Sequence, residues 1–453
     1  MFMRETIQSL PLIQIQRSSA ASYPTPARQT NFHLFDTETG KHILLANGSR
    51  IFTISDDIAA ALEGNLGDSD QLLEKLGLSA PDYITDEPLS NAPVRSLSLA
   101  IAQKCNLGCT YCYAQEGNFG SKNKDMSAEV ATASVNLLFS EVSEGEKVNL
   151  AFLGGEPLTN RKLLRECTER AVALAKSKNV SVNFSITTNG TLVTPEDGAF
   201  FERYKFAVTV SLDGIGEVHN RLRAFKSGSG SYQRILENIR PLLAMQREMQ
   251  VSARVTVTPD NLFLRETLDE FISLGFHSVG FSPMLSSPNA SGEMNSNQLD
   301  LMLAQMISCG EEFERRVAGG ERFPFLNMAN ALREIHKGTH RPYPCGAGAG
   351  YLGVSADGGL YACHRFVEDE DGAMGKVAGG VDREKQKRWL ADRHVHFQEP
   401  CRSCWARYLC GGGCHHEVIK RGRPACNYIR GWLHYCLQAY IRLLEQRPDY
   451  FGV

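Results

Sequence analysis

The sequence lacks the long apolar runs that would place the chain in a membrane. No stretch approaches the roughly eighteen consecutive apolar residues that a transmembrane helix needs. The first 30 residues have no apolar core of the kind that a signal peptide carries, so we expect a cytoplasmic protein. Charge of one sign is also scarce, because 48 Lys and Arg stand against 51 Asp and Glu. This balance gives no support for binding nucleic acid or a membrane surface.

Cysteine, in contrast, is plentiful and unevenly placed. The chain has 13 cysteines among 453 residues, and in a reducing compartment such residues are metal ligands more often than disulfide partners. Three of them lie together near residue 105, and eight crowd the last quarter of the chain. Only Cys167 and Cys309 stand alone, and we expect both to be small buried core residues.

Length and patterning predict about three domains. Short alternating runs between turn signals, followed by two helical segments, predict a small α+β domain near the N-terminus. Six apolar, β-branched runs then alternate with helical segments, which favours parallel βα units in a partial (β/α)6 barrel. The predicted division is a flexible arm at 1–30, the α+β domain at 31–90, the barrel at 95–307, a bridging segment at 308–344 and a cysteine-rich domain at 345–453.

The first cysteine group has the spacing C-x3-C-x2-C, formed by Cys105, Cys109 and Cys112. It follows the first strand of the predicted barrel, and such barrels place their chemistry at the carboxyl ends of the strands. Three thiolates on one loop suit three irons of a [4Fe–4S] cluster, with the fourth iron open to a substrate. A zinc site completed by a distant His or Cys is the alternative. The spacing alone does not decide between them.

Further motifs make a resemblance specific. The loop "CNLGCTYC", with Tyr111 in its aromatic position, resembles the cluster loop of the radical S-adenosylmethionine (SAM) superfamily. The motifs "GGEP" at Gly154–Pro157, "TTNG" at Thr187–Gly190 and "SLDG" at Ser211–Gly214 follow at successive predicted strand ends, as in that superfamily. The chain is identified as a member on these four motifs.

The resemblance implies an activity and a set of binding residues. Members cleave SAM reductively into methionine and a 5′-deoxyadenosyl radical, which removes a hydrogen atom from the substrate. Ordinary turn or capping roles for Asn189 and Asp213, and a plain ion pair for Arg223, are the alternatives. The residues expected to bind the cofactor are Tyr111, Gly154, Gly155, Glu156, Asn189, Ser211, Asp213 and Arg223.

The late cysteines resemble the SPASM extension of peptide-modifying radical enzymes, whose C-x2-C-x5-C-x3-C core is matched from residue 401 to 414. The resemblance implies two auxiliary [4Fe–4S] clusters, three in all, whereas a zinc ribbon is the alternative. Cys426 is the favoured fourth ligand of the second cluster, and Cys436 is either a core residue or the missing ligand of the first. The implied ligands are Cys345, Cys363 and Cys414 for the first auxiliary cluster, and Cys401, Cys404 and Cys410 for the second.

Two features bear on the substrate. The small N-terminal domain resembles peptide-recognition domains that capture a leader segment as an added strand, although it could simply stabilise the barrel. Anaerobic sulfatase-maturating enzymes carry an aspartate directly after the second auxiliary cysteine, whereas this chain has His364 there, which argues against that activity. His364 is either a weak candidate base or a structural hydrogen bonder.

The favoured hypothesis is a maturase that installs thioether cross-links, resembling the maturase of quinohemoprotein amine dehydrogenase. Its expected partners are a substrate peptide or small protein subunit with a leader segment, and an electron donor such as flavodoxin or ferredoxin. The alternatives are a carbon–carbon or carbon–oxygen cross-linking maturase, a cofactor maturase of the mycofactocin or pyrroloquinoline type, an anaerobic sulfatase maturase, and a non-catalytic zinc scaffold that binds peptides.

Overall fold

A three-stranded antiparallel sheet begins the part of the chain that the computed structural model describes, which is residues 31–64, 69–79 and 82–452. The arm predicted for residues 1–30 lies outside the described residues. Strands β1 (Phe32–Thr37), β2 (Gly40–Leu45) and β3 (Arg50–Ile54) are followed by helices α1 (Asp56–Gly64) and α2 (Ser69–Lys75), as the alternation and turn signals predicted. Their inward side chains form a separate small core.

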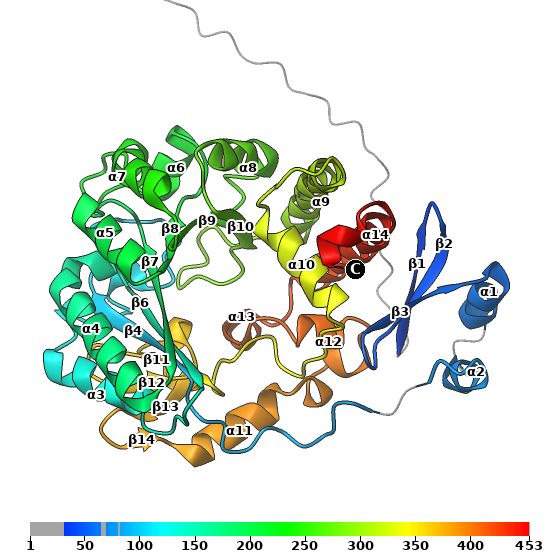
Figure 1. Cartoon of the computed structure of the whole chain (residues 1–453), viewed down its shortest axis with the longest axis horizontal. Coiled ribbons are helices and arrows are strands. Elements are labelled where there is room, and N and C mark those ends of the chain that lie inside the picture. Colours follow the sequence, from blue (N-terminus) through cyan, green and yellow to red (C-terminus); the bar gives the residue numbers. More distant parts are fainter. Residues whose placement is uncertain (1–30, 65–68, 80–81, 453) are drawn as a thin grey trace, which may run out of the picture.

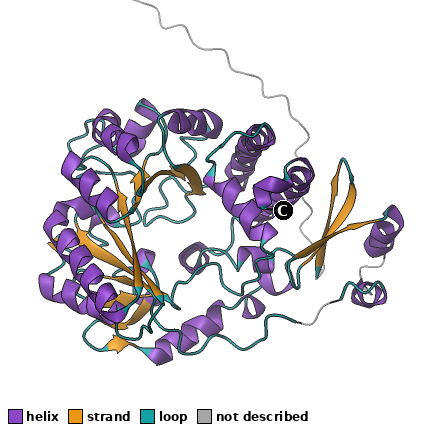
Figure 2. Ribbon diagram, viewed as in Figure 1, coloured by secondary structure: helices purple, strands orange, loops and turns teal. Residues whose placement is uncertain are grey.

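The six predicted barrel runs all form parallel strands of one curved sheet. Apolar side chains alternate along them and pack under helices that line the outer face of the sheet (Figures 1 and 2). The strands, in spatial order, are β10 (Ser278–Pro283), β9 (Gln250–Val257), β8 (Ala207–Ser211), β7 (Ser181–Thr188), β6 (Lys147–Gly154) and β4 (Ser96–Gln103). The helices between them are α3 (Ala128–Leu138), α4 (Arg161–Lys178), α5 (Pro195–Arg203), α6 (Glu217–Leu222), α7 (Tyr232–Met245) and α8 (Leu264–Ser273).

The C-terminal region continues this sheet. Strand β11 (Tyr351–Val354) pairs in parallel with β4, with Tyr351 opposite Ser96, and forms a hairpin with β12 (Gly359–Tyr361). Strands β13 (Ala373–Lys376) and β14 (Gly380–Val381) follow, so the sheet has eleven described strands, including β5 (Lys124–Asp125) beside β4. The turn signal Asp357–Gly359 predicts this hairpin, whereas no pattern in the sequence predicts its pairing with the barrel.

The chain outside this sheet is largely helical in its second half. Helix α9 (Ser296–Ala318) runs across the predicted boundary between the barrel and the bridging segment, and α10 (Leu326–His336) lies within the bridging segment. The C-terminal part contains α11 (Arg383–Arg393), α12 (Arg407–Cys410), α13 (His415–Arg421) and α14 (Cys426–Gln446). The sequence predicts a final helix from about Arg430 to Glu445, whereas α14 already begins at Cys426. No helix of the described residues combines the length and the apolar character required to cross a bilayer.

The small N-terminal sheet docks on the C-terminal region rather than on the barrel (Figure 1). The His33 ring stacks on Trp405 with ring centroids 3.8 Å apart, and its Nε2 atom lies 2.8 Å from His434 Nδ1 of α14. Gln438 of α14 donates to the carbonyl oxygen of Asp36 at 2.8 Å. One edge of the small sheet is therefore in contact with α14, whereas β3 forms the opposite edge.

The barrel core generates a stability prediction. Phe206 is fully buried and its ring lies 5.0 Å from that of Phe201 and 5.3 Å from that of Phe184. Phe206→Ala is expected to lower the free energy of unfolding by about 3–5 kcal/mol, because it leaves a cavity in a packed core. Urea denaturation measures this loss. The control Phe263→Ala, at a side chain that is 63% exposed, is expected to stay within about 0.5 kcal/mol of the wild type. Equal losses in both variants would contradict the packing described.

Candidate active site

The loop that carries Cys105, Cys109 and Cys112 begins where β4 ends, at the carboxyl edge of the parallel sheet. Two main-chain hydrogen bonds, from Gly108 to the Ala224 carbonyl at 2.9 Å and from Thr110 to the Leu222 carbonyl at 3.1 Å, tie it to the segment after α6. Burial raises the pKa of all three thiols, to about 11 for Cys109. Such thiols keep their protons until a metal displaces them, so binding of a metal cluster releases protons here.

The "GGEP" segment lies directly against this loop. Gly155 donates to the Ala102 carbonyl at 2.8 Å, and Glu156 donates to the Lys104 carbonyl at 2.9 Å. A Cβ atom on Gly155 would stand 2.2 Å from the Lys104 oxygen, and one on Gly154 would stand 2.1 Å from the Ala102 oxygen. Only glycine therefore allows this close approach of the two main chains.

The carboxylate of Glu156 is fully buried beneath the loop. Its Oε1 accepts a hydrogen bond from Thr188 Oγ1 at 2.8 Å, and its Oε2 accepts one from the main-chain N–H of Asn189 at 2.7 Å. The Asn189 side chain donates to Asn106 at 2.9 Å and lies 3.7 Å from Cys105 Sγ. The structure thus brings the predicted residues Glu156 and Asn189 together beside the cluster loop.

A second buried group joins Tyr111, Asp213 and Arg223. The Tyr111 hydroxyl donates to the Asp213 carboxylate, and Arg223 donates to that hydroxyl at 2.8 Å and to Asp213 at 3.3 Å. The Thr256 amide donates to the other Asp213 oxygen at 2.7 Å. Burial by itself would lower the pKa of Arg223, because it disfavours the charged guanidinium. Nearby Cys109 and Asp213 have the opposite and larger effect, so the pKa is raised. Ser211 is half-buried at the end of β8, in register with Arg254.

These residues fit a SAM and [4Fe–4S] site on two observations. Arg223 Nε is buried and has no hydrogen-bond partner among the described residues, so the guanidinium has a donor left for a ligand. A cavity of about 620 Å³ leaves space for a cluster beside Cys109 and Cys112, although none of the eight residues expected to bind SAM lines it. The donor set of three half-buried thiols suits iron–sulfur ligation.

A second cysteine group lies where the C-terminal region meets the barrel. Burial raises the pKa of Cys363 to about 12, and Cys414 and Cys345 add to this effect, so both lie in its surroundings. Cys345 is exposed, Cys414 is half-buried and Cys363 is buried. These are the three residues that the resemblance assigned to the first auxiliary cluster, although the described residues contain no group of three or more His, Cys, Asp or Glu side chains arranged to hold a metal ion.

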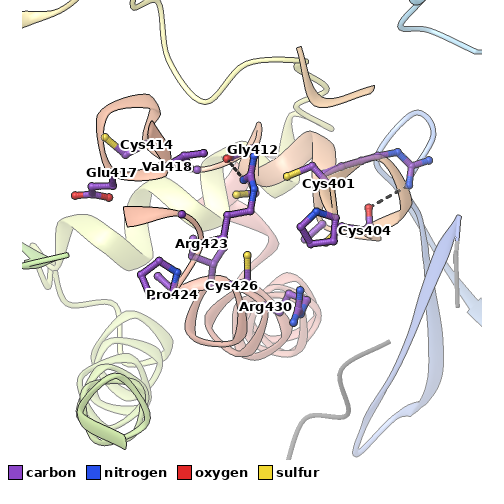
Figure 3. Close-up of a pocket in the computed structure, with 18 of the residues that line it drawn as sticks. Cys401, Cys404, Gly412, Cys414, Glu417, Val418, Arg423, Pro424, Cys426 and Arg430 are labelled. Carbon is purple, nitrogen blue, oxygen red and sulfur yellow. Dashed lines mark hydrogen bonds between the residues drawn. The ribbon is translucent and has the colours of Figure 1, made fainter. Parts of the chain in front are cut away.

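A third group contains four cysteines. Burial raises the pKa of Cys401 to about 12, with further contributions from Cys410, Cys426 and Cys404. In Figure 3 the side chains of Cys401 and Cys426 point toward one another from different elements. These cysteines, with Cys414 nearby, line a cavity of about 60 Å³. Cys426 stands at the first residue of α14 and is the fourth member that the sequence analysis favoured.

Cys436 has the surroundings of a core residue, which is one of the two alternatives given for it. It is fully buried in the middle of α14, and its Sγ lies 3.8 Å from Met328 Sδ of α10. The structure brings it to neither cysteine group, because the turn of α14 that carries it packs on neighbouring helices. Cys167 and Cys309 are likewise buried in α4 and α9, as expected of core residues.

Several polar residues stand between the first and second cysteine groups. His364 Nδ1 lies 2.7 Å from the Tyr351 hydroxyl, and burial lowers the His364 pKa to about 4, so its ring is neutral at pH 7. Arg365 forms an ion pair with Glu417 at 2.7 Å and lies 5.5 Å over the Tyr113 ring. Sequence reasoning singled out His364 but missed the others. Tyr113 and Arg365 directly follow Cys112 and His364, which was the available signal.

Arg254 was also missed, although its signal was sharper. It is the one charged residue of strand β9, whose other side chains are apolar or uncharged polar. Its side chain donates to Ser282 of β10 and remains accessible to solvent. Burial nevertheless lowers the pKa of Arg254, with Glu417 acting in the opposite direction. These opposing facts place Arg254 inside the opening of the barrel, surrounded by protein but reached by water.

Comparison with known proteins agrees with this geometry. The Radical SAM superfamily model matches residues 99–269. The cysteine-type anaerobic sulfatase-maturating enzyme of Clostridium perfringens is 31% identical over 378 residues, covering 78% of this chain and 96% of that enzyme. The chain belongs to the radical SAM maturase family. A radical SAM maturase binds SAM and a [4Fe–4S] cluster, and this chain is accordingly an enzyme.

Two further relatives support the assignment. The serine-type anaerobic sulfatase-maturating enzyme of Klebsiella aerogenes is 25% identical to this maturase over 357 residues, covering 76% of this chain and 85% of that enzyme. The solved structure of native anSMEcpe with bound AdoMet superposes with a TM-score of 0.63 at 21% identity, covering 77% of this chain and 98% of that one. This last likeness shows that the maturase has the same fold.

The buried ion pair generates a prediction for this maturase. Asp213→Asn removes the charge that balances Arg223, and breaking such a buried pair is expected to lower the free energy of unfolding by about 3–5 kcal/mol. The control Asp269→Asn removes an exposed partner of Arg265 and is expected to cost less than about 1 kcal/mol. Guanidinium denaturation compares the two. If both variants unfold at the same denaturant concentration, the buried network of Tyr111, Asp213 and Arg223 does not stabilise the protein.

Proposed function

We propose that this maturase installs thioether cross-links in a partner peptide or small protein subunit and uses three [4Fe–4S] clusters. The observation that carries the proposal is the unequal division of the late cysteines. Four of them, including Cys426, form one group, whereas Cys345, Cys363 and Cys414 form a group of three. Besides burial, Cys414 and Cys345 act on the pKa of Cys363, and Cys414 also lines the cavity beside the group of four.

A three-cysteine group leaves one iron of a cubic cluster without a protein thiolate. A cysteine of the substrate is a suitable fourth ligand, because its thiolate is then held beside the carbon to which it must bond. Cys345 is exposed, so a peptide reaches this group from solvent. When bound, the SAM cluster supplies the radical chemistry that removes hydrogen from that carbon. Formation of the thioether removes two hydrogen atoms from the peptide.

The chain's own residues hold the reacting groups. Arg223, supported by Asp213, is placed to bind the carboxylate or ribose of SAM, and Glu156 fixes the turn at Asn189 next to Cys105. Arg254 and His364 border the space between the cluster loop and the group of three, where the peptide would lie. His364 already bonds to Tyr351, so we assign it a positioning role in the peptide channel.

The N-terminal domain is proposed to hold the leader segment of the partner. Its sheet ends at β3, whose outer edge offers main-chain groups to an added strand. The opposite edge at β1 contacts α14, so a bound leader is tethered to the C-terminal cysteine region. An external one-electron donor, such as flavodoxin or ferredoxin, completes the proposed set of partners.

Sulfatase-type oxidation is the second candidate, because relatives that cover most of this chain are anaerobic sulfatase-maturating enzymes. His364 stands where an aspartate is expected for that activity. Mass spectrometry of a modified cysteine peptide separates the two reactions. A thioether retains the sulfur and loses two hydrogen atoms, whereas oxidation of cysteine to an aldehyde replaces the sulfur with oxygen.

Iron analysis tests the ligand assignment. Wild-type protein purified without oxygen is expected to contain about 12 irons per chain, and the triple variant C105A/C109A/C112A about 8. The matched pair of variants Cys426→Ala and Cys436→Ala tests the ligands of the group of four more directly. The first is expected to fall toward about 8 irons, because it opens the group of four, whereas the second is expected to keep about 12. Zinc in place of iron would overturn the radical mechanism and favour the peptide-binding scaffold.

An added thiol tests the open position. N-acetylcysteine is expected to change the electron paramagnetic resonance spectrum of the reduced C105A/C109A/C112A variant, in which only the auxiliary clusters remain. The same spectrum should not respond in a variant that also lacks Cys345, Cys363 and Cys414. A spectrum of the first variant that ignores the thiol would show that the group of three has no free iron, and would contradict thioether formation by this route.

A further inference from the structure

The charge of the chain is concentrated around the group of four cysteines. Residues 383–430 contain 11 Lys and Arg but only 4 Asp and Glu. The rest of the chain has 37 Lys and Arg against 47 Asp and Glu, so its net charge is −10, whereas the segment carries +7. Part of this excess is balanced across the fold, because Arg383, Lys420 and Arg421 form ion pairs with acids outside the segment. Other arginines of the segment have no such partner and lie near Cys401, Cys404, Cys410 and Cys426.

Four arginines of this segment border the group of four, and we name Arg393, Arg402, Arg423 and Arg430 the arginine rim. In Figure 3 Arg423 and Arg430 flank Cys426. Both lower the pKa of the Cys426 thiol, against a larger effect of burial, which shows how near their charges are. Arg402 lies between Cys401 and Cys404 and is exposed.

The rim is not neutralised by the protein. No carboxylate of the described residues lies within 4.0 Å of a guanidinium nitrogen of any rim arginine, although many other arginines of the chain have such a partner. Arg423 donates instead to Gln398 and to the Gly412 carbonyl, and Arg430 donates to Asn427. Asp86 of the linker is engaged with His396. The exposed acids nearest the rim in the sequence are Asp392 and Glu399, and besides burial, which lowers it, the charge of Asp392 acts on the pKa of Arg393.

An exposed aromatic ring accompanies these charges. Phe397 is 55% exposed, and its short helix η5 (Val395–Phe397) packs against η6 (Cys401–Ser403), which carries the first cysteine of the group. An apolar side chain within a charged border is the usual composition of a protein interface. The surface thus offers both long-range attraction and a short-range contact.

We propose that the arginine rim is the docking surface for an acidic one-electron carrier protein. This proposal rests on the proposed function in one respect, namely that the group of four holds a [4Fe–4S] cluster. On docking, the carrier is oxidised by one electron and that cluster is reduced by one. The remainder of the chain repels an acidic partner, so diffusional encounters are directed to the rim. A carrier, rather than an acidic peptide, is favoured because the basic charge surrounds the redox-active cysteines themselves.

The experiment compares charge-reversal variants of the iron-loaded protein, with a purified bacterial flavodoxin as the probe. Binding is measured by surface plasmon resonance at low and at physiological ionic strength. The double variant R402E/R430E is expected to weaken flavodoxin binding at least tenfold at low salt, and R402Q/R430Q to lie between it and the wild type. Wild-type binding should weaken steeply with salt, because exposed charges are screened beyond about 8 Å at physiological ionic strength.

A matched control makes the same change of charge elsewhere. Arg234 and Arg240 are exposed on α7, in the barrel, and R234E/R240E is expected to alter binding less than twofold. Equal weakening in both double variants, or wild-type binding that does not respond to salt, would overturn the rim as the docking surface. The proposal is also overturned if polyglutamate displaces flavodoxin and binds the protein as tightly as flavodoxin does, because the rim would then bind any polyanion.

A chemical reductant separates this proposal from the proposed function. With dithionite as the electron source, R402E/R430E is expected to retain its iron and to cleave SAM at the wild-type rate, whereas cleavage driven by flavodoxin falls at least tenfold. If dithionite supports no SAM cleavage even in the wild type, the proposed function fails. If flavodoxin drives R402E/R430E as well as the wild type, the docking surface is wrong and the proposed function stands.

Discussion

Close main-chain contact between the end of β6 and the cysteine loop after β4 is the constraint on which the site depends. A side chain at Gly154 or Gly155 would overlap the carbonyls of Ala102 and Lys104, and one at Gly117 would stand 2.7 Å from Cys105 Cβ. Because no side chain separates the two segments, hydrogen bonds of the sheet continue into the loop. The loop is thereby held by the barrel, and the three thiols keep a fixed position relative to Glu156 and Asn189.

The buried charges of the barrel stabilise this geometry. Asp213 receives donors from Tyr111, Arg223 and the Thr256 amide, so one carboxylate joins the cluster loop, the segment after α6 and strand β9. A buried ionic group of this kind is costly unless every partner is in place. The network therefore favours a single arrangement of the three elements, and it leaves Arg223 Nε as the donor that remains for a ligand.

Sequence patterns predicted the barrel well because each strand has a local signal. Runs such as Val148–Phe152 are apolar and bounded by turn residues, and the motifs at their ends follow the strand order directly. The division of the late cysteines depended on longer-range packing. Cys426 and Cys436 are ten residues apart on one helix, and only the packing of α14 decides which of them reaches the group of four. Arg254 was missed for a similar reason, since its position inside the barrel opening follows from tertiary structure.

Pairing of β11 with β4 explains how two distant parts of the chain meet at one site. Strand β4 ends at the loop of Cys105, and β11 runs beside it in parallel, with Val354 opposite Leu99. The hairpin then returns through β12 to Cys363, so the first auxiliary group is connected to the cluster loop through continuous sheet. Movement of the cysteine-rich region about a hinge at residues 344 and 345 would separate β11 from β4 and so break this sheet. The cysteine-rich region is therefore part of the barrel's framework, and the separation of the two cysteine groups is set by strand register rather than by a linker.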